Sequence, residues 1–340
     1  MSKAGAARKL AAASAFGGVG LSVVGASLYG LLRAEASMAR RVIGPTSAPT
    51  PDASGAYGRQ LQGPPIRLAL LGDSGAVGYG MTDPDHTPGA ILAAGLAEMT
   101  GRPVRLTVDA VVGAEARHLG GQIDRALDSQ PDAAVIIIGA NDVTHTRPPT
   151  ESVRTLGTAV RRLRDAGCAV VVGTCPDLGT IRPIAPPLRQ VARLWSRRLA
   201  AAQTIAVVEA GGRSVSLGAL LGPEFDAAPT EFFGPDRFHP SGQGYASVAA
   251  AILPSLAASL GFCPEGEDLP ETFRGEGILP VSYAAAEASR DAGTEVAPTE
   301  IGGHERGPRG RWVSLRHRRR SPLPDVERVE ETADADSSRR

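Results

Sequence analysis

The sequence has little of what marks several classes of protein. Aromatic residues are only 4% of the chain, which argues against a lectin-like surface or a surface on which nucleic-acid bases stack. The 36 basic and 36 acidic side chains give a formal net charge of zero, so the usual electrostatic reason to expect a nucleic-acid partner is missing. Hydrophobic residues still make up 42% of the 340 residues, which excludes a wholly disordered chain.

Cysteine is also scarce. The three cysteines, Cys168, Cys175 and Cys263, are too few for a disulfide framework. Cys168 and Cys175 bracket one apolar run, and an extended strand of that length holds their Cα atoms too far apart for a disulfide. We therefore expect buried or free thiols.

Several catalytic and binding motifs are absent. The chain has no G-x-S-x-G nucleophile elbow, which disfavours an ordinary α/β-hydrolase. It has no P-loop, no H-E-x-x-H and no paired C-x-x-C. We expect neither a cofactor nor a metal ion at the active site.

A long uncharged run lies at the N-terminus. Residues 10–32 carry no charge and as a helix would span on the order of 34 Å, enough to cross a bilayer. Residues 1–9 are basic and are interpreted as a cytoplasmic segment or as the n-region of a signal peptide. Residues 10–33 are interpreted as a transmembrane signal anchor or a signal peptide. A retained anchor is favoured because the run is long for a removable segment. This predicts membrane contact through residues 10–32 and a location at the cell membrane with the catalytic domain outside the cytoplasm, or secretion if the segment is cleaved.

Two further regions are interpreted as appendages. Residues 34–65 are rich in proline, serine and glycine and are predicted to be a linker. Hydrophobic periodicity fades after residue 262, and residues 263–340 hold a basic block followed by an acidic block. Such blocks are typical of disordered tails, so a disordered tail is predicted there.

Residues 66–262 alternate short apolar runs with longer amphipathic ones. Runs that are apolar nearly throughout are typical of parallel strands buried on both faces. The alternation predicts one α/β domain, a flavodoxin-like three-layer sandwich around a doubly wound five-stranded parallel sheet. The five runs are residues 66–72, 104–110, 133–139, 169–174 and 205–210. Ligands of such sheets bind at the carboxyl ends of the strands, so the residues that end each run are the candidates for function.

Polar residues and glycines stand at those ends. Ser74 follows the first run, Gly113 the second and Asn141 the third, while Asp236 and His239 precede the last predicted helix. Acyl transfer needs these residue types: a serine nucleophile, a histidine base with a carboxylate partner, and donors to an oxyanion.

The base can be assigned by elimination. Of the six histidines, only His239 has a carboxylate three residues before it in the loop that enters the last predicted helix. His304 and His317 fall in the predicted tail, and His118 lies in a helix-forming run where an exposed position is expected. His86 is expected in a polar turn, while His145, just after the third run, could line the pocket.

The combination of blocks resembles the SGNH/GDSL hydrolase family, the GDSL esterases and lipases. The matching blocks are GDS at residues 72–74 with Gly78, Gly113, GAND at residues 139–142, and Asp236-x-x-His239. The resemblance covers residues 66–262, and the blocks occur in the family's order.

The resemblance implies a role for each matching residue. Ser74 would be the nucleophile, His239 the general base and Asp236 the carboxylate that orients it. The backbone N–H groups of Ser74 and Gly113 and the side-chain amide of Asn141 would form the oxyanion hole. A glycine at position 113 is expected to leave room for close approach of the backbone to the reacting oxygen. Asp142 is interpreted as structural, while Asp73 either supports the site indirectly or accepts backbone N–H bonds in its turn.

The function expected is therefore that of a serine esterase, which hydrolyses short-chain, lipid or O-acetyl carboxylic esters through an acyl-enzyme. Its partner would be a small-molecule, lipid or cell-envelope ester. Transfer of the acyl group to an acceptor other than water remains open. A flavodoxin-like module that binds a phosphate on the turn after the first strand is a further alternative, but it leaves Asn141, Asp236 and His239 without a role.

Overall fold

The computed structural model describes residues 30–38, 41, 50–218, 228–262, 274–301, 304–305 and 312–318. The strands are β1 (Gly55–Tyr57), β2 (Ile66–Gly72), β3 (Val104–Val108), β4 (Ala133–Ile137), β5 (Ala169–Gly173), β6 (Arg213–Val215), β7 (Gly277–Pro280), β8 (Thr294–Pro298), β9 (Glu300–Ile301), β10 (His304–Glu305) and β11 (Trp312–His317). The helices are α2 (Ser74–Val77), η1 (Pro84–His86), α3 (Pro88–Thr100), η2 (Ala116–His118), α4 (Leu119–Asp128), α5 (Ala140–Thr144), α6 (Pro149–Asp165), η3 (Leu178–Thr180), α7 (Leu188–Glu209), α9 (Pro229–Phe232), α10 (Gly242–Ser259) and α11 (Val281–Ala288).

The centre of the sheet is parallel, in the order β3-β2-β4-β5-β6. This is the flavodoxin-type order, in which the second strand of the domain lies outside the first. The first four of these strands occupy predicted apolar runs. Of the residues 205–210 predicted as the fifth strand, 205–209 belong to α7, and β6 follows at Arg213. The predicted α/β class is confirmed.

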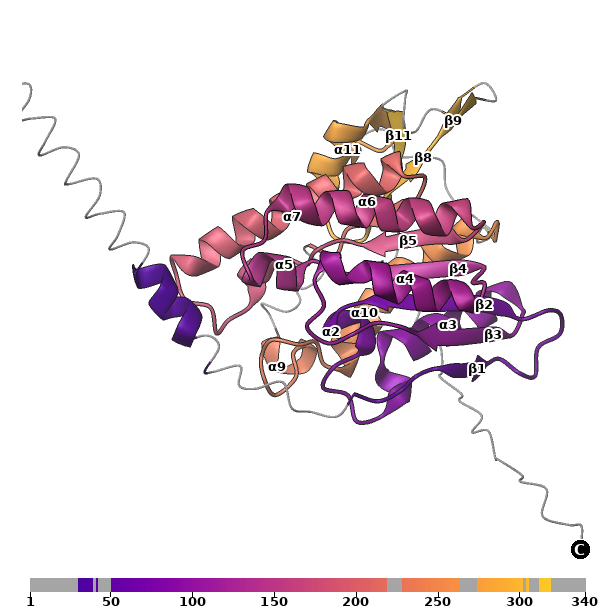
Figure 1. The fold of residues 1–340 in the computed structure, drawn as a ribbon, viewed down its shortest axis with the longest axis horizontal. Coiled ribbons are helices and arrows are strands. Elements are labelled where there is room, and N and C mark those ends of the chain that lie inside the picture. The colour runs from indigo at the N-terminus through magenta and orange to yellow at the C-terminus, as the bar shows by residue number, and fades with distance from the viewer. Residues whose placement is uncertain are drawn as a thin grey trace, which may run out of the picture.

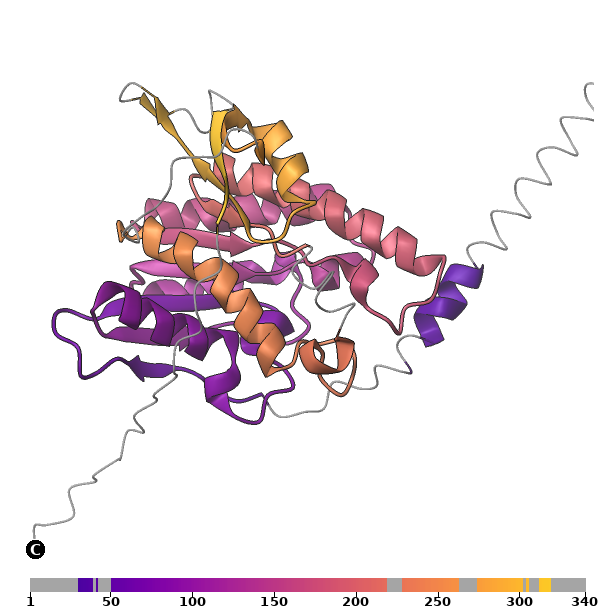
Figure 2. The same ribbon diagram turned by 180° about the vertical axis from the view of Figure 1, so that it is seen from behind.

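Helices cover both faces of this sheet, as Figures 1 and 2 show from opposite sides. Alternate residues of β2 point to opposite faces, as in any strand. Leu68 and Leu70 pack in one core with α3 and α10, whereas Ala69 and Leu71 pack in a second core with α4, α6 and α7. A strand buried on both sides explains why the residues 66–72 are apolar almost throughout.

Local signals set the ends of the helices. In α3 the Thr87 side chain accepts a hydrogen bond from the N–H of Ala90 at 3.3 Å, Pro88 opens the first turn, and Gly101 ends the helix in a left-handed conformation. In α10 the Ser241 side chain accepts from the N–H of Gly244 at 3.2 Å. The second cap fixes the start of α10 just after His239.

The sheet extends beyond its parallel centre at both edges. Strand β1 pairs antiparallel with β3, so part of the predicted linker, residues 34–65, belongs to the sheet and buries Tyr57 completely. At the other edge β8 pairs antiparallel with β6, and β11 lies between β8 and β7. This sheet therefore has nine strands among the described residues, and β9 pairs with β10 separately.

The predicted disordered tail is therefore wrong for residues 274–301 and 312–318. Glu295 on β8 is 1% exposed and is paired with Arg213 at 2.5 Å and with Arg318. Burial raises the pKa of Glu295, but Arg318 and Arg213 more than offset this, so its pKa lies below the ordinary value. Two charges of the predicted tail, Glu295 and Arg318, are therefore paired inside the fold.

The predicted membrane anchor, residues 10–33, lies mostly outside the described residues. Residues 30–38 are helical and include Arg33 and Glu35, whose carboxylate accepts a hydrogen bond from the N–H of Leu188 at 2.9 Å. Within the ranges given above, no helix is both long and apolar enough to cross a bilayer. The prediction of a transmembrane segment, and of a location at the cell membrane that rests on it, is corrected accordingly.

Candidate active site

Ser74 lies at the sharp turn from β2 into the short helix α2. Gly72 ends the strand with φ +136°, and a Cβ there would lie 1.9 Å from the carbonyl oxygen of Ile137, so no other residue fits. Asp73 caps α2 by accepting a hydrogen bond from the N–H of Gly75 at 2.9 Å. The serine side chain is thus held at the carboxyl end of the sheet, where it is 8% exposed.

His239 and Asp236 lie in the loop between α9 and α10. The Asp236 carboxylate accepts hydrogen bonds from the backbone N–H groups of Phe238 and His239, each at 3.0 Å, which folds the loop back on itself. Its other oxygen lies 2.6 Å from Nδ1 of His239, and Nε2 of His239 lies 3.0 Å from Oγ of Ser74. The three predicted residues therefore form one hydrogen-bonded chain.

The imidazole of His239 is held by packing as well. Its ring centroid lies 4.5 Å from that of Tyr79 and 4.9 Å from that of Phe238. The side chain of His239 is buried, whereas that of Asp236 is about one-quarter exposed. A ring enclosed in this way keeps one orientation toward Ser74.

The two aspartates near Ser74 have opposite pKa shifts. Partial burial raises the pKa of Asp236, but its hydrogen bonds with the His239 side chain and two backbone N–H groups outweigh that effect, so its pKa is lowered. Burial raises the pKa of Asp73 to about 6, although the N–H of Gly75 and the charge of His239 act in the other direction. Asp236 is thus held as a carboxylate, the form that can orient an imidazole.

Gly113 occupies the third position of a turn that the Ala114 N–H closes on the Val111 carbonyl at 3.1 Å. Its φ is +79°, while a Cβ on it would meet no heavy atom within 4 Å. The left-handed backbone therefore requires glycine here, while the expected room for the reacting oxygen stays a prediction. Among the described residues, the backbone N–H groups of Ser74 and Gly113 donate to no other group.

Asn141 lies in the first turn of α5, directly after β4. One N–H of its side-chain amide donates to the carbonyl of Ala114 at 3.0 Å, which leaves the second N–H for another acceptor. Gly139 precedes α5 with φ +132°, and a Cβ there would lie 2.9 Å from the side chains of Cys175 and Gln203. The hydrogen bond from Asn141 to Ala114 ties the loop that carries Gly113 to the residue predicted to complete the oxyanion hole.

A cluster around Glu115, which was not predicted from the sequence, also connects the loop of Gly113 to the segment of Asn141. Glu115 is 3% exposed, and its carboxylate binds Arg147 at 2.6 and 3.1 Å, Arg117 at 3.0 Å and Nδ1 of His145 at 2.9 Å. Burial raises the pKa of Glu115, but the bonds from Arg147 and His145 more than offset it, so the pKa is lowered. Most of these partners lie about thirty residues away, so no local pattern announces the cluster.

Asp142 makes a second link of the same kind. Its carboxylate accepts hydrogen bonds from the Ser152 hydroxyl at 2.5 Å and from the N–H of Ala116 at 3.1 Å. Burial raises the pKa of Asp142, and these two hydrogen bonds lower it by less, so the pKa lies above its ordinary value. Asp142 thus has contacts of the structural kind expected of it.

The remaining histidines and cysteines have other surroundings. His86 lies in the polar turn η1, 3.9 Å from Asp83, and Nδ1 of His118 accepts the N–H of Glu115 at 2.9 Å. Cys168 and Cys175 are free and buried, as predicted, while Cys263 lies outside the described residues.

A small cavity of about 70 Å³ opens beside Ser74 and His239. Its walls come from several elements and are mainly apolar, with Ile137, Leu178, Ile181, Leu217, Phe238 and Val248 among them. An apolar recess beside a serine hydroxyl suits a short hydrocarbon chain better than a charged group.

A flavodoxin-like α/β sandwich with a GDS turn, a GAND block and an Asp-x-x-His loop at one edge defines the SGNH class of hydrolases. This chain belongs to the GDSL-like Lipase/Acylhydrolase family, whose model matches residues 70–247. It is 43% identical over 264 residues to the GDSL-like esterase Rv1075c of Mycobacterium tuberculosis, covering 74% of this chain and 83% of the relative. The protein is therefore a carboxylic ester hydrolase.

Solved structures of similar shape were also found. LAE5, an alpha/beta hydrolase from the metagenome of Lake Arreo, is 19% identical with a TM-score of 0.47, over 59% of this chain and 97% of its own. Axe2, an acetylxylan esterase from Geobacillus stearothermophilus, is 17% identical with a TM-score of 0.44, over 59% of this chain and 97% of its own.

Proposed function

We propose that the protein hydrolyses its ester through Ser74, His239 and Asp236 in two steps. In the first, Oγ of Ser74 attacks the ester carbonyl while Nε2 of His239 accepts the hydroxyl proton. The tetrahedral intermediate then expels the alcohol, which takes that proton from His239, and an acyl-serine remains. In the second, a water molecule gives a proton to His239 and attacks the acyl carbon. The intermediate then expels Oγ of Ser74, which takes that proton from His239, and the acid is released.

The observation that carries this assignment is the hydrogen-bond chain from Asp236 through His239 to Ser74, with distances of 2.6 and 3.0 Å. A serine hydroxyl is a weak nucleophile unless a base takes its proton. The lowered pKa of Asp236 keeps this residue as an anion that stabilises the imidazolium formed during attack.

We assign the oxyanion hole to the backbone N–H groups of Ser74 and Gly113 and the side-chain amide of Asn141. The two backbone groups have no other acceptor among the described residues, and Asn141 uses one of its two amide protons on Ala114. Each such donor is typically worth about 3 kcal/mol of transition-state stabilisation.

We further propose that the cavity beside Ser74 receives the acyl group and that short chains are preferred. A cavity of about 70 Å³ holds a few carbon atoms, and the walls are mainly apolar. The selectivity would then arise from the depth of this recess.

The test is hydrolysis of p-nitrophenyl esters of graded chain length by the full chain and its variants. We expect the highest kcat/KM for the acetate or butyrate ester. Ser74→Ala and His239→Ala should lose activity on the order of 10⁴-fold or more. Ser129→Ala at the end of α4 and His86→Ala in the exposed turn η1 are matched controls that should retain it. Undiminished turnover by Ser74→Ala would remove the nucleophile assignment, and a preference for long chains would remove the acyl-pocket assignment.

A further inference from the structure

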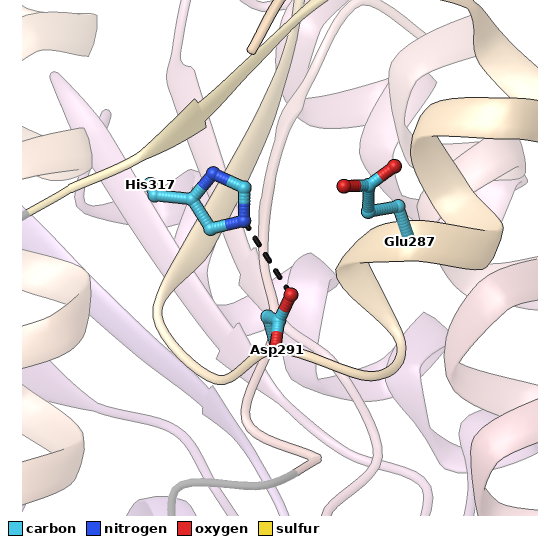
Figure 3. Close-up of side chains that lie close together, drawn as sticks. All are labelled: Glu287, Asp291 and His317. Atoms are coloured by element: carbon cyan, nitrogen blue, oxygen red, sulfur yellow. Dashed lines mark ion pairs between the residues drawn. The ribbon is translucent and has the colours of Figure 1, made fainter. Parts of the chain in front are cut away.

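Three side chains of metal-binding type meet in the C-terminal part of the sheet, away from Ser74 (Figure 3). Glu287 lies in the last turn of α11, Asp291 follows this helix, and His317 ends β11. One nitrogen or oxygen atom from each of the three lies within 4.8 Å of those of the others. None of the three lines the cavity beside Ser74.

The local backbone explains why they meet. The N–H of Asp291 approaches the carbonyl of Glu287 at 3.3 Å, so the helical path continues for one turn and both carboxylates lie on one face. His317 pairs with Thr294 in the β8–β11 ladder, three residues after Asp291. This register brings Nε2 of the histidine to 3.6 Å from the Asp291 carboxylate.

A fourth residue holds the imidazole in place. The Glu276 carboxylate lies 3.2 Å from Nδ1 of His317 and accepts the backbone N–H of the same residue at 3.0 Å. With Nδ1 bound in this way, Nε2 is the nitrogen that faces the Asp291 side. A carboxylate on the far ring nitrogen is the usual arrangement around a metal-binding histidine in proteins.

The charges around this cluster also favour a cation. Over the residues that the structure describes, no arginine or lysine forms an ion pair with Glu287 or Asp291. The Glu287 carboxylate lies against Gly275, where a Cβ would be 2.8 Å from Oε1. The side chain of Asp291 is 60% exposed, so an ion can enter from solvent.

We propose that Glu287, Asp291 and His317 bind a divalent transition-metal ion such as zinc. One imidazole nitrogen and two carboxylate oxygens are a ligand set that zinc accepts, with water completing the coordination. The ion would join α11 to β11 and so stabilise the C-terminal extension of the sheet. It takes no part in the chemistry at Ser74.

The test is titration of the full chain with Zn²⁺ by calorimetry, together with thermal unfolding and the visible spectrum of the Co²⁺ form. We expect one ion per chain with a Kd of roughly 10 µM or lower and a rise in Tm of several degrees. The isosteric variants Glu287→Gln and Asp291→Asn should weaken binding about 10-fold or more and remove the Tm shift. Asp165→Asn, an exposed carboxylate at the end of α6, is the matched control and should bind as the unmodified protein does.

Circular dichroism on each variant shows whether the fold is retained. Because the side chain of Asp291 is exposed, Asp291→Asn is the variant expected to disturb the fold least. Binding that is weaker than about 100 µM, or that Asp291→Asn leaves within about 3-fold of the original affinity, overturns the proposal. So does a Co²⁺ spectrum that is the same in Asp291→Asn as in the unmodified protein.

Discussion

Nε2 of His239 lies 3.0 Å from Oγ of Ser74, although 165 residues separate them in the chain. Ser74 is placed by the turn after β2, and His239 by a loop capped at the start of α10. Since β2 and α10 pack in the same hydrophobic core, the stability of that core maintains this distance. Small displacements at such a contact are costly, because proton transfer requires hydrogen-bond reach.

The first prediction concerns the carboxylate behind this pair. Asp236→Asn keeps the size of the side chain but favours the wrong tautomer of His239, so kcat should fall by about 10³- to 10⁴-fold with little change in KM. Steady-state kinetics on a p-nitrophenyl ester measure this. Asp124→Asn, which alters an exposed carboxylate on α4, should leave kcat unchanged. Equal kcat in Asp236→Asn and the original protein would be incompatible with the proposed role.

The second prediction concerns the oxyanion hole. Asn141→Ala removes one proposed donor and should lower kcat by about 10²- to 10³-fold, because the lost bond strengthens only in the transition state. Thr144→Ala, on the same short helix, loses only an exposed bond to the Asn141 carbonyl and serves as the control. A change confined to KM would contradict a role in the transition state.

The third prediction concerns Glu115 as a positioning residue. Glu115→Gln weakens its bonds with Arg147 and His145, so the Gly113 turn should shift relative to Asn141. We expect kcat to fall on the order of 10- to 100-fold while KM changes little. Glu115→Asp, which keeps the charge, should recover part of the loss. If Tm fell but kcat stayed constant, the cluster would be structural only.

The fourth prediction is a pH dependence of stability at Asp73. Its folded-state pKa of about 6 lies above the ordinary value, so the folded chain binds more protons than the unfolded chain as pH passes from about 4 to 6. The contribution of Asp73 therefore becomes less favourable as pH rises through this window, by an upper limit of about 3 kcal/mol.

Asp73→Asn keeps an acceptor for the Gly75 N–H but has no charge to bury. Its free energy of unfolding relative to the original protein should thus increase between pH 4 and pH 7, as measured by urea unfolding at each pH. A difference that is constant with pH would show that Asp73 is not perturbed. Asp165→Asn should give such a constant difference.

The fifth prediction concerns the C-terminal extension. A chain that ends at residue 265 lacks β8, which leaves the edge of β6 unpaired and deprives Arg213 of its buried partner Glu295. We expect a lower Tm and aggregation, because unpaired strand edges associate. A chain that ends at residue 318 keeps every described strand and should unfold close to the full chain. Equal Tm values for both would show that the extension adds no stability.

Short-range patterns predicted four of the five strands in the parallel centre of the sheet, but not β6, and they selected the candidate site residues. Continuous apolar runs such as residues 66–72 indicate strands buried on both faces, and the structure buries β2 in two cores. The Thr87–Pro88 start and Gly101 end of α3 are local capping signals of the same short range. In the site, Ser74, Asp236 and His239 were predicted from their positions next to strands and helices, and they lie within hydrogen-bond distance.

What sequence alone missed depends on contacts between distant residues. Glu295 looks like a surface charge until Arg213 and Arg318 are brought around it, and Glu115 has no visible partner until α5 places His145 and Arg147 beside it. Burying a carboxylate is unfavourable unless cations approach it from elsewhere in the fold. Periodicity and motif spacing report local backbone conformation, so they predicted most of the central strands and the residues that we propose to react. Only the tertiary structure decided which charges are buried, which strands join the edges of the sheet, and that Glu287, Asp291 and His317 lie together.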